Sequence, residues 1–281
     1  MKKIMAAKNI SQIKVLVIGS GNIAWHIVSH LSFFKRFDIT VYNRTSTPHL
    51  KQLHKEFKVS VITDWKNVSK ETDLFFICTS DSAIKTIADK IRKSKVKGFV
   101  IHTSGTAPLK EIASASKNTG VFYPLQTFSF GQSVFWPEVP VFVEGNDTRS
   151  LNFMLSFAKL FSESVVKLNS EQRLKLHLAA VIAGNFSNAM YAAANTFTEK
   201  ELGKDFFKYL IPLIVKTAKK TRSVSPANAQ TGPAARGDKK TQKQHLVLLK
   251  KYPDLKKIYK SLSKLIEKQQ KADAKLQRKT K

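Results

Sequence analysis

The strongest constraint on the fold is a glycine turn between an apolar run and a helix-length segment near the N-terminus. Residues 13–18 are apolar and mostly β-branched, and the run ends in Gly19, Ser20 and Gly21. A helical segment follows, and then a second short apolar run at residues 39–42. This order of strand, glycine turn, helix and strand predicts a βαβ unit.

The turn carries the pattern G-x-G-x-x-A, in which each small residue has a physical role. Gly19 permits the tight turn, Gly21 lets the backbone approach a pyrophosphate, and Ala24 lets the helix pack closely on the strand. The first free amides of the helix, which begins near Asn22 and Ile23, would bind the phosphates. We therefore expect a dinucleotide site, and the alternative is a glycine turn without a ligand.

The end of the second strand favours one dinucleotide. NAD sites usually place an acidic residue there, whereas this chain has Asn43, Arg44, Thr45 and Ser46. A guanidinium followed by two hydroxyls suits a 2′-phosphate, because Arg binds phosphate oxygens in a bidentate manner and stays charged. The sequence thus predicts NADP(H). The alternative is that Arg44 is a solvated surface residue of a lysine-rich chain.

Composition sets the broad class. The chain has 281 residues and 42% hydrophobic content, which is enough for a large core and about two domains. The single cysteine, Cys78, excludes an internal disulfide, and its apolar neighbours predict a buried strand thiol in a reducing compartment. The opening MKKIMAAKNISQ lacks the apolar core of a signal peptide, and no run is long enough to span a membrane. We expect a cytoplasmic protein and assign no metal ligands.

The formal charge of +28 is unusual. Such a field attracts anions, among them a phosphate-rich cofactor, an acidic metabolite and nucleic acid. Between residues 239 and 281 there are fifteen Lys or Arg and three acidic residues, with Tyr252 and Tyr259 as the only aromatics. We interpret this region as solvated helix faces, with a nucleic-acid arm as the less favoured alternative.

The alternation of strands and helices continues to about Asn169. Expected strands are residues 59–63, 74–80, 99–103, 121–128 and 139–143, with helices at 81–94 and from Pro108. This pattern predicts an α/β fold, a doubly wound Rossmann domain over residues 1–169. Ligands bind at the carboxyl ends of such strands, where Thr79, Ser80, His102 and Ser104 lie.

From Ser170 the pattern becomes helical, which predicts an all-α domain over residues 170–270 and a basic, disordered tail over residues 271–281. The first long helix is apolar all round and should therefore be buried in this domain. Further helices are expected at residues 206–221, 240–250 and 254–270.

A polar stripe interrupts the first long helix. At about 100° per residue, His177, Val181, Gly184 and Asn188 share one face, and Asn185 lies beside it. Polar groups on an apolar helix are costly unless bonded, and Gly184 costs about 1 kcal/mol relative to alanine. The stripe suggests a ligand that approaches closely. The alternative is hydrogen bonding of these side chains to neighbouring helices.

A loop at residues 229–238, AQTGPAARGD, separates two of the later helices. Its glycines and proline exclude a regular helix, and loops of this kind often carry function. Two interpretations of Arg236 remain open. Either it faces an anionic substrate or it pairs with Asp238.

Together these motifs resemble a bacterial family of predicted NADP oxidoreductases. The likeness rests on GSGNIAWH, DLFFICTSD, HTSG, GVFYPLQTF, EQRLKLHLAAVIAGNFSN and AQTGPAARGD, and covers residues 13 to about 265. It implies a Rossmann-like domain followed by a helical domain of undefined function. Its relatives are pyrroline-5-carboxylate reductase and the 6-phosphogluconate and 3-hydroxyisobutyrate dehydrogenases, whose helical domains complete the active site and often dimerise. The resemblance therefore implies a homodimer formed through the helical domain.

By this resemblance, the family's motif positions map onto the turn, the strand ends and the helical region. They are Gly19, Gly21, Arg44, Thr79, Ser80, His102, Ser104, Gln126, His177, Asn185, Thr231 and Arg236. We expect Gln126, Asn188, Thr231 and Arg236 to contact the substrate. The 6-phosphogluconate-type dehydrogenases carry a catalytic Lys with an Asn on the first helix of the second domain, and Lys175 does not align securely with that Lys.

The expected activity is hydride transfer between NADP(H) and a small carbonyl, imine or hydroxy-acid substrate. The nicotinamide would lie near Thr79, Ser80 and His102, and the substrate beside His177 and Asn185. His177 is the first candidate for the proton, since an unperturbed imidazole titrates near neutrality. The other candidates for catalysis are His102, Ser104, Asn185 and Lys175. The alternative function is a catalytically silent NADP(H)-binding sensor or scaffold.

Overall fold

The chain is described by a computed structural model that covers residues 12–279, with side chains to residue 272. The expectation of no signal peptide concerns residues 1–11, which lie outside the described residues. The chain divides into two compact units, Met1–Asn185 and Phe186–Lys281. Within the described part, no helix is both long and apolar enough to cross a membrane.

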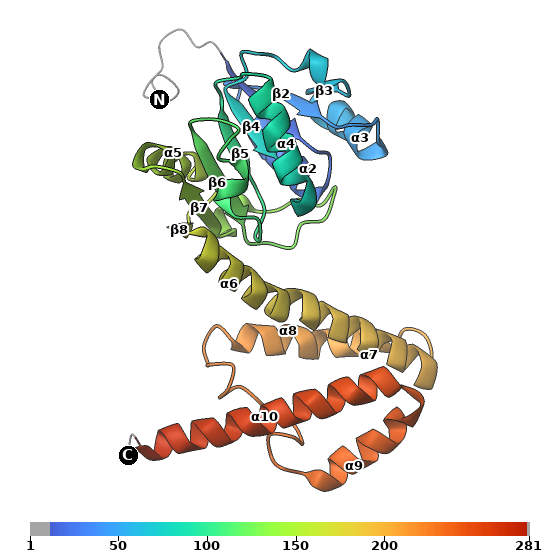
Figure 1. Ribbon diagram of the computed structural model, residues 1–281. Helices are drawn as coiled ribbons and strands as arrows, with labels where there is room; N and C mark the ends of the chain where they lie inside the picture. The colour runs from blue at the N-terminus through green and yellow to red at the C-terminus, as the bar shows by residue number, and fades with distance from the viewer. Residues whose placement is uncertain (1–11, 280–281) are drawn as a thin grey trace. The chain divides into compact units, whose positions relative to one another are not determined.

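The first unit is built on an eight-stranded sheet in the order β3-β2-β1-β4-β5-β6-β7-β8 (Figure 1). Strands β1 to β6 are parallel, β7 is antiparallel to β6, and β8 is parallel to β7. The order of the first six strands is that of a doubly wound dinucleotide fold, so the predicted fold class is confirmed. The strands are β1 (Ile13–Ile18), β2 (Phe37–Tyr42), β3 (Ser60–Ile62), β4 (Leu74–Ile77), β5 (Phe99–His102), β6 (Thr119–Pro124), β7 (Val141–Gly145) and β8 (Val165–Lys167).

Helices cover both faces of the sheet, because successive strand residues point to opposite sides. In β1, Val15 and Val17 pack with α2, α3 and α5, whereas Leu16 and Ile18 pack with α4 and η2. The helices of this unit are α2 (Asn22–Ser32), α3 (Pro48–Phe57), α4 (Asp81–Lys93), α5 (Thr148–Ala158) and α6 (Ser170–Ala180), with 3₁₀ turns η1 (Trp65–Asn67), η2 (Leu109–Ile112) and η3 (Trp136–Glu138).

The central strand β4 is buried on both faces, as its continuous apolar run predicts. Cys78 follows it and is 5% exposed. Burial raises the pKa of its thiol to about 12, while a hydrogen bond with Thr103 opposes the shift. The interpretation of Cys78 as an inert buried thiol agrees with this environment.

The expected strand over residues 121–128 was wrong at its C-terminal end. Strand β6 stops at Pro124, and the chain then packs against α2 instead of continuing in the sheet. There the Asn22 side-chain amide donates to the Phe128 carbonyl (2.9 Å), and His26 Nε2 lies 3.0 Å from the Ser129 carbonyl. The helix expected from Pro108 is only the short η2.

Helix α6 begins where the sequence places a helix but belongs to the first unit, because a buried arginine ties it to the sheet. Asn169 and Gln172 form a capping box at its start. One turn on, Arg173 is 1% exposed, forms an ion pair with Glu144 of β7 and donates to the Ala107 carbonyl (2.6 Å). The Ser170 hydroxyl also donates to Glu144 (2.9 Å). The predicted division at Asn169 therefore differs from the observed division after Asn185.

The second unit is helical but has almost no core of its own. It contains α7 (Ser187–Glu201), η5 (Phe206–Leu210), α8 (Ile211–Lys220), α9 (Lys239–Leu248), η6 (Leu249–Lys251) and α10 (Pro253–Lys279). Among its described residues only Thr198, Ala234 and Leu249 are buried. The expectation that the first long helix is buried all round was wrong for a single chain.

The C-terminal helix is longer than predicted. Helix α10 continues through residues expected to be a disordered tail and ends at Lys279, and residues 280–281 lie outside the described part. Its many Leu, Lys, Gln and Ala residues favour helix, and no Gly or Pro follows Pro253 to stop it.

The anchoring of α6 gives a stability prediction. Arg173→Ala leaves Glu144 without its partner in a largely buried setting, so we expect a loss of about 3 to 5 kcal/mol in the free energy of unfolding. Urea denaturation followed by circular dichroism measures this loss. Lys175→Ala is the matched control, because it breaks only an exposed pair with Glu171 on the same helix and should change stability little. Equal effects of the two substitutions would contradict the anchoring role.

Candidate functional site

The glycine turn after β1 has the geometry that its sequence predicts. Gly19 has φ +112°, and a Cβ there would lie 2.4 Å from the Cys78 carbonyl oxygen, so only glycine fits. A Cβ at Gly21 would meet nothing within 4 Å. Gly21 is the N-cap of α2, and no side chain caps the helix. The first amides of α2 therefore have no side-chain cap, which leaves them free to bind a pyrophosphate.

The side chains next to Gly19 and Gly21 hold the turn in place. The Ser20 hydroxyl lies 3.1 Å from the Thr47 hydroxyl at the start of α3, which fixes the turn against that helix. Asn22 is exposed and holds the loop after β6 through its bond to Phe128. Ile23 is half-buried against the core.

Arg44, just after the end of β2, is a cation that could bind a ligand. Asn43 donates to the Thr45 carbonyl (2.7 Å) and so shapes the turn after the strand. Arg44 is exposed, and among the described residues it has no hydrogen bond or ion pair to a protein group. An exposed guanidinium beside the Thr45 and Ser46 hydroxyls fits the 2′-phosphate of NADP better than the diol of NAD.

The carboxyl ends of β4 and β5 bring the other expected residues to the same edge of the sheet (Figure 1). Thr79 is half-buried and Ser80 is exposed at the start of α4. Ser104 is 8% exposed, and its hydroxyl accepts the backbone amides of Thr106 (3.0 Å) and Ala107 (2.9 Å). Ser104 thus shapes the loop after β5, which limits it as a direct catalyst.

His102 is inside the protein, beneath the edge. Its ring has 0% exposure, and Nδ1 accepts the Ser104 amide (3.2 Å). Burial lowers the pKa of His102 to about 3, and the charge of Arg173 adds to the shift. The ring is therefore neutral, with its proton on Nε2, which has no partner in the described part of the chain. A fully enclosed neutral imidazole does not reach a substrate, which argues against His102 as the proton donor.

His177 instead forms a pair that the sequence analysis missed. Its Nδ1 lies 2.9 Å from the Tyr123 hydroxyl, and the two rings meet edge to face at 5.9 Å. Gly105 leaves room for the imidazole, because a Cβ there would lie 2.5 Å from Nδ1. The motif GVFYPLQTF contains Tyr123, but the sequence does not show that its side chain contacts α6.

A π-helical turn, η4 (Val181–Phe186), follows α6 and breaks the expected polar stripe. A π turn holds about one residue more than an α turn, so the faces before and after it do not align. Asn185 is exposed, and Gly184 faces open space rather than a close neighbour.

Of the remaining expected residues, one follows the end of β6 and three belong to the other unit. Gln126 is exposed and bonds only to its neighbour, by accepting the Thr127 amide (2.8 Å). Asn188, Thr231 and Arg236 belong to the second unit and are exposed. Arg236 makes no ion pair with Asp238, which caps α9 by accepting the Thr241 amide (3.0 Å).

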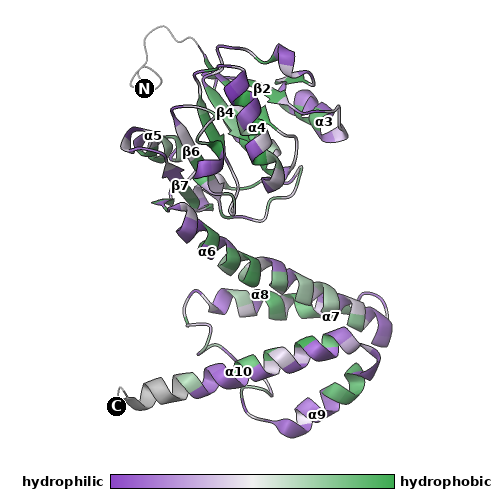
Figure 2. Ribbon diagram, viewed as in Figure 1, coloured by the Kyte–Doolittle hydropathy of each residue, from purple (hydrophilic) through white to green (hydrophobic). Residues whose placement is uncertain are grey.

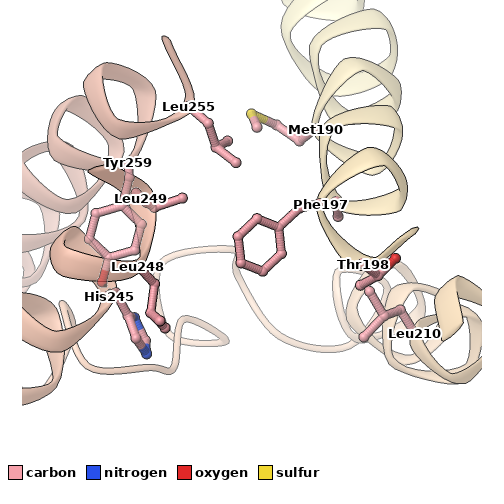
Figure 3. Close-up of a pocket in the computed structure, with 10 residues that line it drawn as sticks. Met190, Phe197, Thr198, Leu210, His245, Leu248, Leu249, Leu255 and Tyr259 are labelled. Atoms are coloured by element: carbon pink, nitrogen blue, oxygen red, sulfur yellow. Dashed lines mark hydrogen bonds between the residues drawn. The ribbon is translucent and has the colours of Figure 1, made fainter. Parts of the chain in front are cut away.

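The second unit contains an apolar cavity of ≈ 420 Å³. In Figure 3, Met190 and Phe197 of α7 face Leu249, Leu255 and Tyr259 of the C-terminal helices. Its one bonded polar pair is His245 and Tyr259, 2.9 Å apart. No cluster of three metal-ligating side chains occurs among the residues that the structure describes.

Comparison with known proteins agrees with the fold. The family model for shikimate/quinate 5-dehydrogenase matches residues 2–101, and the model for a domain of unknown function, DUF2520, matches residues 139–266. No curated protein matches. The crystal structure of "putative NADP oxidoreductase BF3122" from Bacteroides fragilis is 33% identical, with a TM-score of 0.85, over 92% of this chain and 100% of that chain.

Two more distant structures share the fold. The protein TM1727 from Thermotoga maritima is 22% identical, with a TM-score of 0.68, over 92% of this chain and 99% of that chain. A pyrroline-5-carboxylate reductase from Coxiella burnetii is 18% identical, with a TM-score of 0.51, over 92% of this chain and 97% of that chain. The chain therefore belongs to the family of Rossmann-fold oxidoreductases that carry a C-terminal DUF2520 helical domain.

Proposed function

We propose that the protein is an NADP-dependent oxidoreductase that transfers a hydride between NADP(H) and a small carbonyl, imine or hydroxy-acid substrate. The observation that carries the proposal is the open glycine turn at Gly21, with uncapped amides of α2, near the unpaired Arg44. The name of the Bacteroides fragilis relative, "putative NADP oxidoreductase", supports the choice of cofactor.

The residues at this edge have separate tasks in binding the cofactor. The turn from Gly19 to Ile23 would bind the pyrophosphate, and Arg44 with Thr45 would bind the 2′-phosphate. Thr79 and Ser80 lie at the adjacent strand end, where the nicotinamide half would extend. The bound cofactor supplies or accepts the hydride. The protein aligns the two reacting carbons and handles the proton.

We further propose that the chain forms a homodimer through its helical unit. Large apolar side chains of this unit are exposed in the single chain, and they include Phe186 (57%), Tyr209 (68%), Leu213 (63%) and Leu248 (62%). Figure 2 shows the same hydrophobic character along α7 and α8. A helical unit with so few buried residues is not stable alone, and a second copy would cover these faces and the cavity of Figure 3.

Cofactor selectivity tests the role of Arg44. Arg44→Ala should weaken NADPH binding by about 1.5 to 3 kcal/mol, because one charge-assisted contact is lost, and should barely change NADH binding. Isothermal titration calorimetry measures both affinities. Arg92→Ala is the control, since Arg92 pairs with Asp89 on the surface of α4. A similar loss for both cofactors would refute selection through the 2′-phosphate.

Turnover distinguishes an enzyme from a silent NADP(H)-binding sensor. We expect the protein to oxidise NADPH with at least one member of a panel of aldehydes, ketones, imines and 2-oxo acids, measured by loss of absorbance at the reduced nicotinamide band. Tight NADPH binding without oxidation by any member would favour the sensor function.

Light scattering coupled to size-exclusion chromatography tests the dimer. The wild-type protein should elute with twice the 31.6 kDa mass of the chain. Leu213→Glu places a charge on the exposed apolar face of α8 and should shift the protein to monomer. Lys219→Glu, near the end of the same helix, should leave the dimer intact. A Leu213→Glu protein that remains dimeric would place the interface elsewhere.

A further inference from the structure

The direction in which the cofactor lies follows from the strand order. Arg44 lies after β2, on one side of the glycine turn, while β4, β5 and β6 lie on the other side. If the adenosine end lies at Arg44, the nicotinamide end must extend toward β4 and β5. These strands and β6 are parallel, so their carboxyl ends share one edge. Neighbouring strands are about 4.8 Å apart, so the end of β6 is one strand beyond β5.

Tyr123 is the polar side chain that β6 brings to this edge. It is the last residue of the strand before Pro124 and is 8% exposed. Its hydroxyl contacts His177 Nδ1 at 2.9 Å and has no other hydrogen-bond partner within the described residues. A phenol oxygen has two lone pairs and one proton, so it can bond to a ligand and to His177 together.

The position of His177 is fixed from two sides. Arg173, one helical turn earlier, is tied to Glu144 and to the Ala107 carbonyl. Gly105 provides the space that the imidazole occupies. The pair is thus preorganised by groups that are themselves buried or bonded, which is a requirement for an efficient proton donor.

The other candidates are occupied or enclosed. His102 is fully buried and neutral, and the Ser104 oxygen accepts two backbone amides. Lys175 is exposed and forms an ion pair with Glu171 (2.5 Å). The Tyr123–His177 pair, in contrast, is both held in place and able to exchange a proton.

We infer that Tyr123 delivers the proton to the oxygen or nitrogen of the reduced substrate, with His177 as its positioning and proton-supplying partner. This inference rests on the proposed function. A bound reduced cofactor would supply the hydride, with both electrons, to the substrate carbon. The Tyr123 proton goes to the substrate oxygen or nitrogen, and the phenolate takes the Nδ1 proton of His177. His177 Nε2 takes a proton from the solvent as Nδ1 loses its own, so the imidazole stays neutral, and the substrate gains one hydride and one proton to give the alcohol or amine.

The surroundings of Tyr123 and His177 allow the Tyr123 phenol to release a proton and to recover it. Burial raises the pKa of Tyr123, and the positive charge of Arg173 opposes this shift. Arg173 is itself paired with Glu144, and both Arg173 and Asp81 act on the neutral His102. The phenol therefore keeps its proton at neutral pH until His177 supports the developing phenolate.

Single substitutions of Tyr123 and His177 test the inference. Tyr123→Phe should lower kcat for an active panel compound by about 100-fold or more, with the Kd for NADPH within about two-fold of wild type. His177→Asn should lower kcat less and change the pH profile of kcat. Tyr252→Phe removes a phenol hydroxyl that bonds Glu201 (2.6 Å) in the second unit and should behave as wild type. A Tyr123→Phe enzyme with full kcat would overturn the assignment.

A measurement that does not depend on turnover can test the role of Tyr123 separately from the proposed function. Nitrogen-15 NMR of the His177 ring, with NADP⁺ and each panel compound added, reports on the Tyr123–His177 bond. We expect at least one compound to shift the His177 signals in wild type and not in Tyr123→Phe. Unchanged signals with every compound, in a protein that binds NADP⁺, would refute the role of Tyr123. Failure to bind NADP⁺ would refute the proposed function itself.

Discussion

The buried contact between Arg173 and Glu144 determines how the first unit ends and where the side chain of His177 lies. A charge that is 1% exposed must be paired, and this arginine is paired with a strand and with the loop after β5. The helix that carries it is therefore part of the sheet unit rather than of the helical one. His177 follows one turn later and inherits its position from that contact.

The dinucleotide half of the fold could be predicted because its constraints are local. Gly19 shows a positive φ and a close carbonyl, and β4 is buried on both faces, as a continuous apolar run requires. The strand order then follows from alternation and right-handed crossovers. A strand was predicted at residues 139–143, but the antiparallel direction of β7 was not, because nothing in its short sequence distinguishes it from a parallel strand. The short β8 was not predicted at all.

The candidate site could be predicted only in part, because long-range pairing decides it. The sequence indicated His177, Ser104 and His102 as polar residues at strand or helix positions. It did not show that His102 is enclosed or that Ser104 caps its own loop. Tyr123 reads as an ordinary strand aromatic, and its bond to His177 joins residues 54 positions apart. The π turn was also missed, since apolar periodicity does not reveal an extra residue per turn.

The loop between β6 and η3 links the two parts of the proposed site, which are Tyr123 at the end of β6 and the start of α2. It leaves the sheet after Pro124, the residue that follows Tyr123, crosses to α2 and is held there by Asn22 and His26. The segment that carries the phenol is thus attached to the helix whose amides face the pyrophosphate. An insertion in this crossing would therefore disturb two places at once, the strand end that carries the phenol and the start of the helix after the glycine turn.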